Sequence, residues 1–180
     1  TAYEALAIMA ERQIRQLIVV AGERVAGLVS ERDLFSLQRV SMRQVSGDLR
    51  AATRVDELKR IADDIRRLTQ NLMAQGVAAE PLTRTIASLN DALSRRVIEI
   101  TLSRHDLADT DWCWLALGSE GRGEQTFATD QDNALVFDAV DDADAARQRP
   151  ALLAFAAEVN DALDRLGFPR CTGNVMASNP

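Results

Sequence analysis

Hydrophobic and polar positions along the first 40 residues follow a helix–strand–strand pattern. Apolar residues at helical spacing predict a helix over residues 3–12. Two short apolar runs, residues 17–20 and 25–29, predict strands that turn at Gly22. The pattern therefore indicates a small α/β unit over residues 1–40.

Two long helical patterns occupy the middle of the chain. Residues 41–52 are polar and weakly periodic, which predicts a linker. Apolar residues then recur every three or four positions over residues 58–72, up to a stop at Gly76, and again over residues 82–100, after a helix start at Pro81. A linker and an antiparallel helical hairpin are thus expected between the first unit and residue 111.

The polar faces of these two helices are rich in arginine and aspartate. The simplest interpretation is that they face solvent. The alternative is a grip on a partner through Arg66, Arg67, Arg95 and Arg96.

The last part of the chain, residues 112–180, is predicted to be a domain with a sheet. Apolar runs at residues 112–117 and 132–138 predict two strands of a mixed sheet. A helix is expected to begin at Pro150 and to end at Gly167. The fold class is therefore α+β, and we expect this domain to continue beyond residue 180.

Charge and composition exclude several classes of function. The net charge is −6, and Lys59 is the only lysine, so non-specific binding to nucleic acid or to an anionic membrane surface is not expected. The sequence has no apolar run long enough to span a bilayer and no secretion signal. Its one histidine, His105, lies outside any metal-binding pattern, which argues against histidine-dependent triads and zinc sites.

The two cysteines, Cys113 and Cys171, form no CxxC pair. Cys113 lies within an apolar run, so a buried thiol is expected there. This cysteine usage fits the reducing cytoplasm.

Candidate chemistry is concentrated between the two predicted strands of the last domain. A strand that ends in Gly118 and Ser119 can turn sharply and present N–H groups and a hydroxyl to a phosphate. Asp130 and Asp132 are two positions apart at the start of a strand, which places both carboxylates on one face. Adjacent carboxylates repel unless a cation lies between them, and Mg²⁺ is the ion that prefers carboxylate and phosphate oxygens. Together these features indicate metal-assisted phosphoryl or nucleotidyl transfer.

The segment LGSEGRGEQTFATDQDNALVF resembles the active-site signature of nucleotidyltransferases. It is most similar to the CBS-associated nucleotidyltransferases of the DUF294 group, and it also resembles the PII uridylyltransferases and the glutamine synthetase adenylyltransferases. The resemblance implies that Gly118 and Ser119 hold the triphosphate of an NTP and that Asp130 and Asp132 bind Mg²⁺ as catalytic residues. The remaining nucleotide-binding positions, which either touch phosphate or shape the loop by pairing, are Arg122 and Glu124.

The segment IRQLIVVAGERVAGLVSERDL, residues 14–34, resembles the later part of a CBS domain. The resemblance implies that Ser30 and Asp33 hold an adenine nucleotide and that the segment pairs with another CBS segment, for which a homodimer is one route. The spacing of Ser30 and Asp33 is also that of a capping box at a helix start, which by itself accounts for both residues.

The function implied by these resemblances is Mg²⁺-dependent transfer of NMP from an NTP to a protein acceptor. Related transferases carry a third acidic residue on a later strand, whereas this sequence has no Asp or Glu after Asp164. The third carboxylate lies beyond residue 180, or Asp138 or Glu124 replaces it, or the site binds nucleotide without catalysis. The alternative function is a non-catalytic module that senses nucleotide and binds a partner. Neither the NTP nor the acceptor follows from the sequence.

Overall fold

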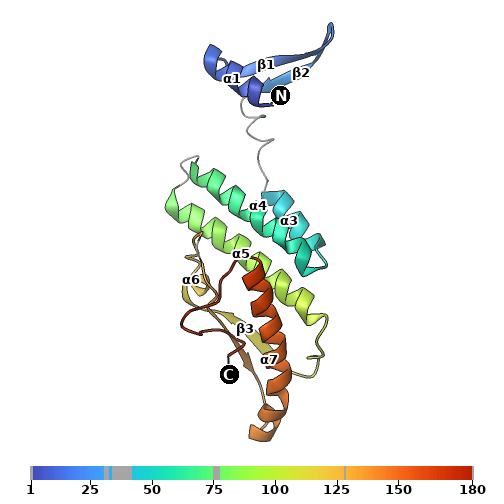
Figure 1. The fold of residues 1–180 in the computed structure, drawn as a ribbon, viewed down its shortest axis with the longest axis vertical. Coiled ribbons are helices and arrows are strands. Elements are labelled where there is room, and N and C mark those ends of the chain that lie inside the picture. Colours follow the sequence, from blue (N-terminus) through green and yellow to red (C-terminus); the bar gives the residue numbers. More distant parts are fainter. Residues whose placement is uncertain (1, 31–32, 34–41, 75–77, 128, 180) are drawn as a thin grey trace. The chain divides into compact units, whose positions relative to one another are not determined.

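The computed structural model describes residues 2–30, 33, 42–74, 78–127 and 129–179 (Figure 1). The chain divides into two compact units, Thr1–Ser41 and Met42–Pro180. Both units combine helices with a two-stranded sheet, so the α+β fold class is confirmed. Among the described residues, no helix is both long enough and apolar enough to cross a membrane.

The first unit has the predicted helix and strand pair. Helix α1, Ala2–Arg12, precedes strands β1, Gln16–Ala21, and β2, Arg24–Ser30, which pair antiparallel. Gly22 makes the turn between the strands at φ 63°, a conformation that glycine adopts without steric cost.

The second unit begins with a helix where the sequence predicted a linker. Helix α3, Met42–Ala51, buries Val45 and Leu49. These are two apolar side chains four positions apart, and this is too short a repeat to stand out from the polar residues around it. The linker prediction for this segment was therefore wrong.

The predicted helical hairpin is confirmed. Helix α4, Val55–Ala74, and helix α5, Ala79–Leu102, run side by side with their apolar faces buried (Figure 1). Leu58, Leu93 and Val97 are completely buried. The predicted stop at residue 76 lies outside the described residues.

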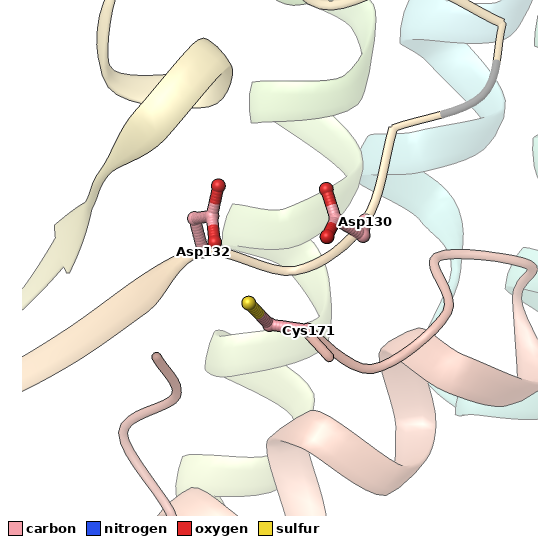
Figure 2. A group of neighbouring side chains, drawn as sticks. All are labelled: Asp130, Asp132 and Cys171. Carbon is pink, nitrogen blue, oxygen red and sulfur yellow. The ribbon is translucent and has the colours of Figure 1, made fainter. Parts of the chain in front are cut away.

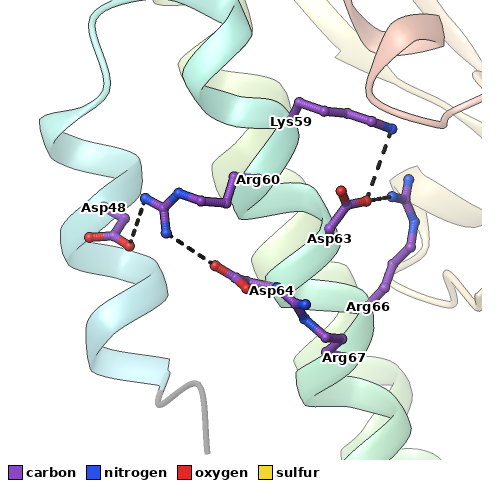
Figure 3. A network of polar contacts seen from close by, with 7 residues as sticks. All are labelled: Asp48, Lys59, Arg60, Asp63, Asp64, Arg66 and Arg67. Carbon is purple, nitrogen blue, oxygen red and sulfur yellow. Dashed lines mark hydrogen bonds and ion pairs between the residues drawn. The ribbon is translucent and has the colours of Figure 1, made fainter.

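The arginines of α4 bind within the unit. Arg60 reaches both Asp64 and Asp48 of α3 at 3.4 Å. Arg66 donates to the backbone oxygen of Leu166 at 2.5 Å. Figure 3 shows the whole network of seven side chains, Asp48, Lys59, Arg60, Asp63, Asp64, Arg66 and Arg67. Because the exposed pairs of such a network contribute only about 0–1 kcal/mol each, the network mainly orients α4 against its neighbours. This arrangement favours a structural role over a partner grip.

Strands β3, Trp112–Ala116, and β4, Asn133–Phe137, form the second sheet, close to the predicted bounds. Helix α7, Asp142–Arg165, packs against this sheet through Phe155, which is fully buried. The ring centroids of Trp112 and Trp114 lie 5.1 and 6.3 Å from that of Phe155, in edge-to-face geometry. Phe155 thus holds α7 against β3, the strand that leads to the candidate site.

Cys113 is exposed, so the expected buried thiol was wrong. Side chains alternate along a strand, and Trp112 and Trp114 take the face that α7 covers. Cys113 therefore points to the opposite face of the sheet. Apolar neighbours in the sequence did not predict its burial correctly, because those neighbours point to the other face.

Helix α7, Asp142–Arg165, begins eight residues before the predicted start at Pro150. The side chain of Asp141 accepts a hydrogen bond from the Asp144 amide at 2.8 Å and caps the helix. Aspartates in the first turn also suit the positive end of the helix dipole. The acidic stretch at residues 141–144 therefore forms the cap and the first turn of the helix.

Candidate nucleotide and metal site

A tight turn follows β3 and brings the chain against the start of β4. The Leu117 amide donates to the backbone oxygen of Asp132 at 2.8 Å. Gly118 then adopts φ 53° and opens a short helix, α6, Gly118–Gly121. The turn therefore joins the two strands at the end where Asp132 lies.

Neighbouring atoms lie so close to the backbone of Gly118 and Gly121 that neither position has room for a side chain. A Cβ at Gly118 would overlap the Asp132 carboxylate, and a Cβ at Gly121 would lie 2.5 Å from the backbone oxygen of Ala116. A side chain at Gly118 would also be strained at its positive φ. The space above Gly118 is thus occupied by the carboxylate that the sequence predicted to bind metal.

Asp130, Asp132 and Cys171 point toward one another (Figure 2). Their carboxylate oxygens and sulfur all lie within 4.8 Å of one another. Among the described residues, neither carboxylate forms a hydrogen bond or an ion pair that would offset its charge. Two uncompensated carboxylates at this separation fit a divalent cation, because the cation removes their mutual repulsion.

Buried side-chain amides hold in place the segment that carries these aspartates, just before β4. Gln131 and Asn133 alternate with the aspartates and are 2% exposed each. Asn160 of α7 is completely buried and donates to Gln131 Oε1 at 2.8 Å and to Asn133 Oδ1 at 3.0 Å. Because inward and outward side chains alternate along an extended segment, this network turns Asp130 and Asp132 toward the opposite side.

The network extends to the last described segment of the chain. Gln131 Nε2 donates to the backbone oxygen of Phe168 at 2.7 Å, and Asn133 Oδ1 accepts from the Ala177 amide at 2.8 Å. The Ser178 amide donates to Asn160 Oδ1 at 3.1 Å. Sequence reasoning missed this network, because lone Asn and Gln residues in apolar surroundings do not reveal which partners they meet.

Glu120 is a second feature that sequence reasoning missed. Its carboxylate accepts a hydrogen bond from Ser94 Oγ of α5 at 3.4 Å. The pKa of Glu120 is raised to about 7, chiefly by burial and also by the negative charges of Asp91 and Asp132, against the lowering effect of the Ser94 hydrogen bond. Glu120 also lines an open groove of about 480 Å³ between α5 and β3. A partly buried carboxyl group therefore lies within the electrostatic field of Asp132.

The raised pKa of Glu120 predicts a pH-dependent stability. The folded protein keeps this proton up to about pH 7, whereas the unfolded chain loses it near 4.5. Stability should therefore fall as pH rises through this window, and Glu120→Gln should remove the loss, which is about 3 kcal/mol above pH 7. Denaturant unfolding from pH 4.5 to 8 without divalent cations measures this difference.

The matched control is Glu80→Gln, which neutralises an exposed carboxylate on α5. It should leave the pH dependence of the wild type in place. Equal pH dependence in Glu120→Gln and the wild type would contradict the burial of a titrating carboxyl at this position.

The loop after Gly118 is held by its own residues. The Glu124 amide donates to the backbone oxygen of Ser119 at 2.9 Å. Arg122 Nε donates to Glu124 Oε2 at 2.8 Å, which is the loop-shaping pair that the sequence offered as one alternative. Ser119, Arg122 and Glu124 remain predicted nucleotide contacts.

Ser30 and Asp33 of the first unit form the reciprocal bonds of a capping box. The Asp33 amide donates to Ser30 Oγ at 3.1 Å, and the Ser30 amide donates to Asp33 Oδ2 at 2.9 Å. The spacing predicted these bonds for a capping box, and adenine nucleotide binding at these residues remains a prediction.

A Gly-Ser turn packed against Asp132, with Asp130 nearby, is the arrangement that the resemblance to nucleotidyltransferases predicts. Residues 63–180 match the family model described as "Putative nucleotidyltransferase DUF294", and residues 1–39 match the CBS domain model. Because the first match covers more than half of the sequence, the chain belongs to the DUF294 family. No curated protein and no solved structure is significantly similar to it.

Proposed function

We propose that the site formed by Gly118, Ser119, Asp130 and Asp132 binds an NTP with Mg²⁺ and transfers its NMP to a protein hydroxyl, as PII uridylyltransferases do. The observation that supports this proposal best is the pair of uncompensated carboxylates beside the Gly118 turn. The membership in a nucleotidyltransferase family supports the reaction class. The same proposal divides the chain into three parts. These are a partial CBS domain at residues 1–40, a linker and helical hairpin at residues 41–111, and a nucleotidyltransferase-like domain at residues 112–180.

In this proposal, Asp130 and Asp132 would hold Mg²⁺, and the bound ion would neutralise phosphate charge and stabilise the leaving pyrophosphate. Gly118 and Ser119 orient the triphosphate through backbone N–H groups and a hydroxyl. The acceptor oxygen forms a bond to the α-phosphorus while the bond from that phosphorus to the pyrophosphate oxygen breaks. The chain's own contribution is therefore charge placement and orientation rather than a covalent intermediate.

The acceptor hydroxyl must also lose its proton. Glu120 suits this role among the described carboxylates, because its pKa of about 7 is near the operating pH and it lines the groove beside α5. We propose Glu120 for the role that the sequence left open between Asp138, Glu124 and a residue beyond 180.

The first unit is proposed to pair with a second CBS segment, supplied by another copy of the chain. The side chains that would be covered are apolar and more than half exposed, namely Ile18, Val20, Val25 and Leu28. Pairing would remove this apolar area from water. An adenine nucleotide is the ligand proposed for the completed pair.

Transfer is tested with the natural full-length protein, NTPs labelled at the α-phosphate and PII-type signalling proteins as candidate acceptors. We expect Mg²⁺-dependent labelling of an acceptor, and Asp132→Asn should lower the rate by at least about 100-fold, since one metal ligand is lost. Labelling at the wild-type rate by Asp132→Asn contradicts the site. Nucleotide binding without transfer to any acceptor tested favours the sensing module instead.

A further inference from the structure

Cys171 lies beside the two aspartates because two backbone hydrogen bonds hold its loop against the start of β4 and the residues just before it. The Gln131 amide donates to the Pro169 oxygen at 2.9 Å, and the Asn133 amide donates to the Val175 oxygen at 3.1 Å. Cys171 falls between these two anchors, and Gln131 also forms a parallel bridge with the neighbouring Arg170. The thiol is thus positioned by Gln131 and Asn133, the two residues on either side of Asp132.

The thiol changes the donor set of the site. Mg²⁺ prefers oxygen ligands, whereas a thiolate selects softer ions such as Zn²⁺. Cys171 and Asp132 are both partly buried, and among the described residues the Cys171 sulfur has no hydrogen-bond partner. Two carboxylates and one thiol also supply three protein ligands, the number found in zinc sites that keep an open position.

The separations permit a single ion. The three ligand atoms lie within 4.8 Å of one another. Tetrahedral Zn²⁺, with bonds of about 2.0–2.3 Å, holds its ligand atoms roughly 3.3–3.7 Å apart, so closure requires only small shifts of side chains. The Gly118 position leaves the Asp132 carboxylate room to make them, because no Cβ is present there.

We propose that Asp130, Asp132 and Cys171 form a site for a thiophilic divalent cation, Zn²⁺, which competes with Mg²⁺. This inference shares the two aspartates with the proposed function and adds Cys171 as a ligand. Zn²⁺ bound in this way would occupy the position that Mg²⁺ needs, so the ion would act as an inhibitor of any Mg²⁺-dependent transfer.

The test is a titration of the 180-residue chain with Co²⁺, which stands in for Zn²⁺ and gives a thiolate-to-metal charge-transfer band. We expect the band in the wild type, its displacement by Zn²⁺, and its loss in Cys171→Ser. Zn²⁺ affinity should fall at least about tenfold in Cys171→Ser, whereas Mg²⁺ affinity should change less than about twofold, because a hard ion gains little from sulfur.

The matched control is Cys113→Ser, which removes the only other thiol and should keep the band. Circular dichroism verifies that both variants are folded. The absence of a band in the wild type, or its persistence in Cys171→Ser, overturns the inference. The band requires no NTP or acceptor, so the two proposals can be tested separately. The band can be absent while Mg²⁺-dependent transfer is observed, and it can be present while no transfer is observed.

Discussion

Asn160→Leu is expected to lower the free energy of unfolding of the Met42–Pro180 unit by about 3–5 kcal/mol, through the loss of several buried hydrogen bonds. Leucine has nearly the shape of asparagine, so the change removes polar atoms and leaves the volume largely unaltered. Gln131 Oε1 and the Ser178 amide would each lose the partner that Asn160 supplies. A buried polar atom without a partner costs about 1–3 kcal/mol. Denaturant unfolding measures the total.

The control for this prediction is Asp164→Leu, an exposed position on the same helix. It should alter stability by no more than about 0.5 kcal/mol, as surface changes usually do. A loss below about 1 kcal/mol in Asn160→Leu would contradict the view that its network fixes the site.

Asp130→Asn/Asp132→Asn is expected to weaken Mg²⁺-dependent NTP binding by at least about 100-fold, because both carboxylate ligands of the ion are lost. The variant should remain folded. Its stability without metal should equal or exceed that of the wild type, because the repulsion between the two carboxylates disappears. Calorimetric titration with NTP measures the binding, and denaturant unfolding measures the stability.

The control for the aspartate pair is Asp106→Asn/Asp109→Asn. Both of these side chains are exposed in the loop before β3, and the change in net charge is the same. Equal weakening by the two double variants would mean that overall charge, rather than the site, determines nucleotide binding.

The helical hairpin and the strands of both sheets could be predicted because each repeats a clear apolar pattern. Helix α3 could not, since it buries only Val45 and Leu49. The early start of α7 was missed because a proline is usually a helix start, whereas here Asp141 caps the helix and Pro150 lies inside it. The apolar repeat therefore predicts long amphipathic elements well. It predicts the start of a helix poorly where a capping residue sets that start.

The candidate site could be predicted in part. Gly118 and Asp132 follow from the motif, and the structure adds the reason for the glycine, which is the overlap of any Cβ with the carboxylate. Glu120 and Cys171 could not be assigned from sequence. Their significance depends on α5 and on the loop after α7, which approach the site only in the folded chain.

Calorimetric titration of the wild-type chain with an NTP, with and without Mg²⁺, tests the central claim most directly. The structure has two carboxylates beside the Gly118 turn, and they require a cation before a triphosphate can approach them. We therefore predict binding that depends on Mg²⁺ and that disappears in Asp130→Asn/Asp132→Asn. Binding of equal strength without the metal, or in the absence of both carboxylates, would contradict the account.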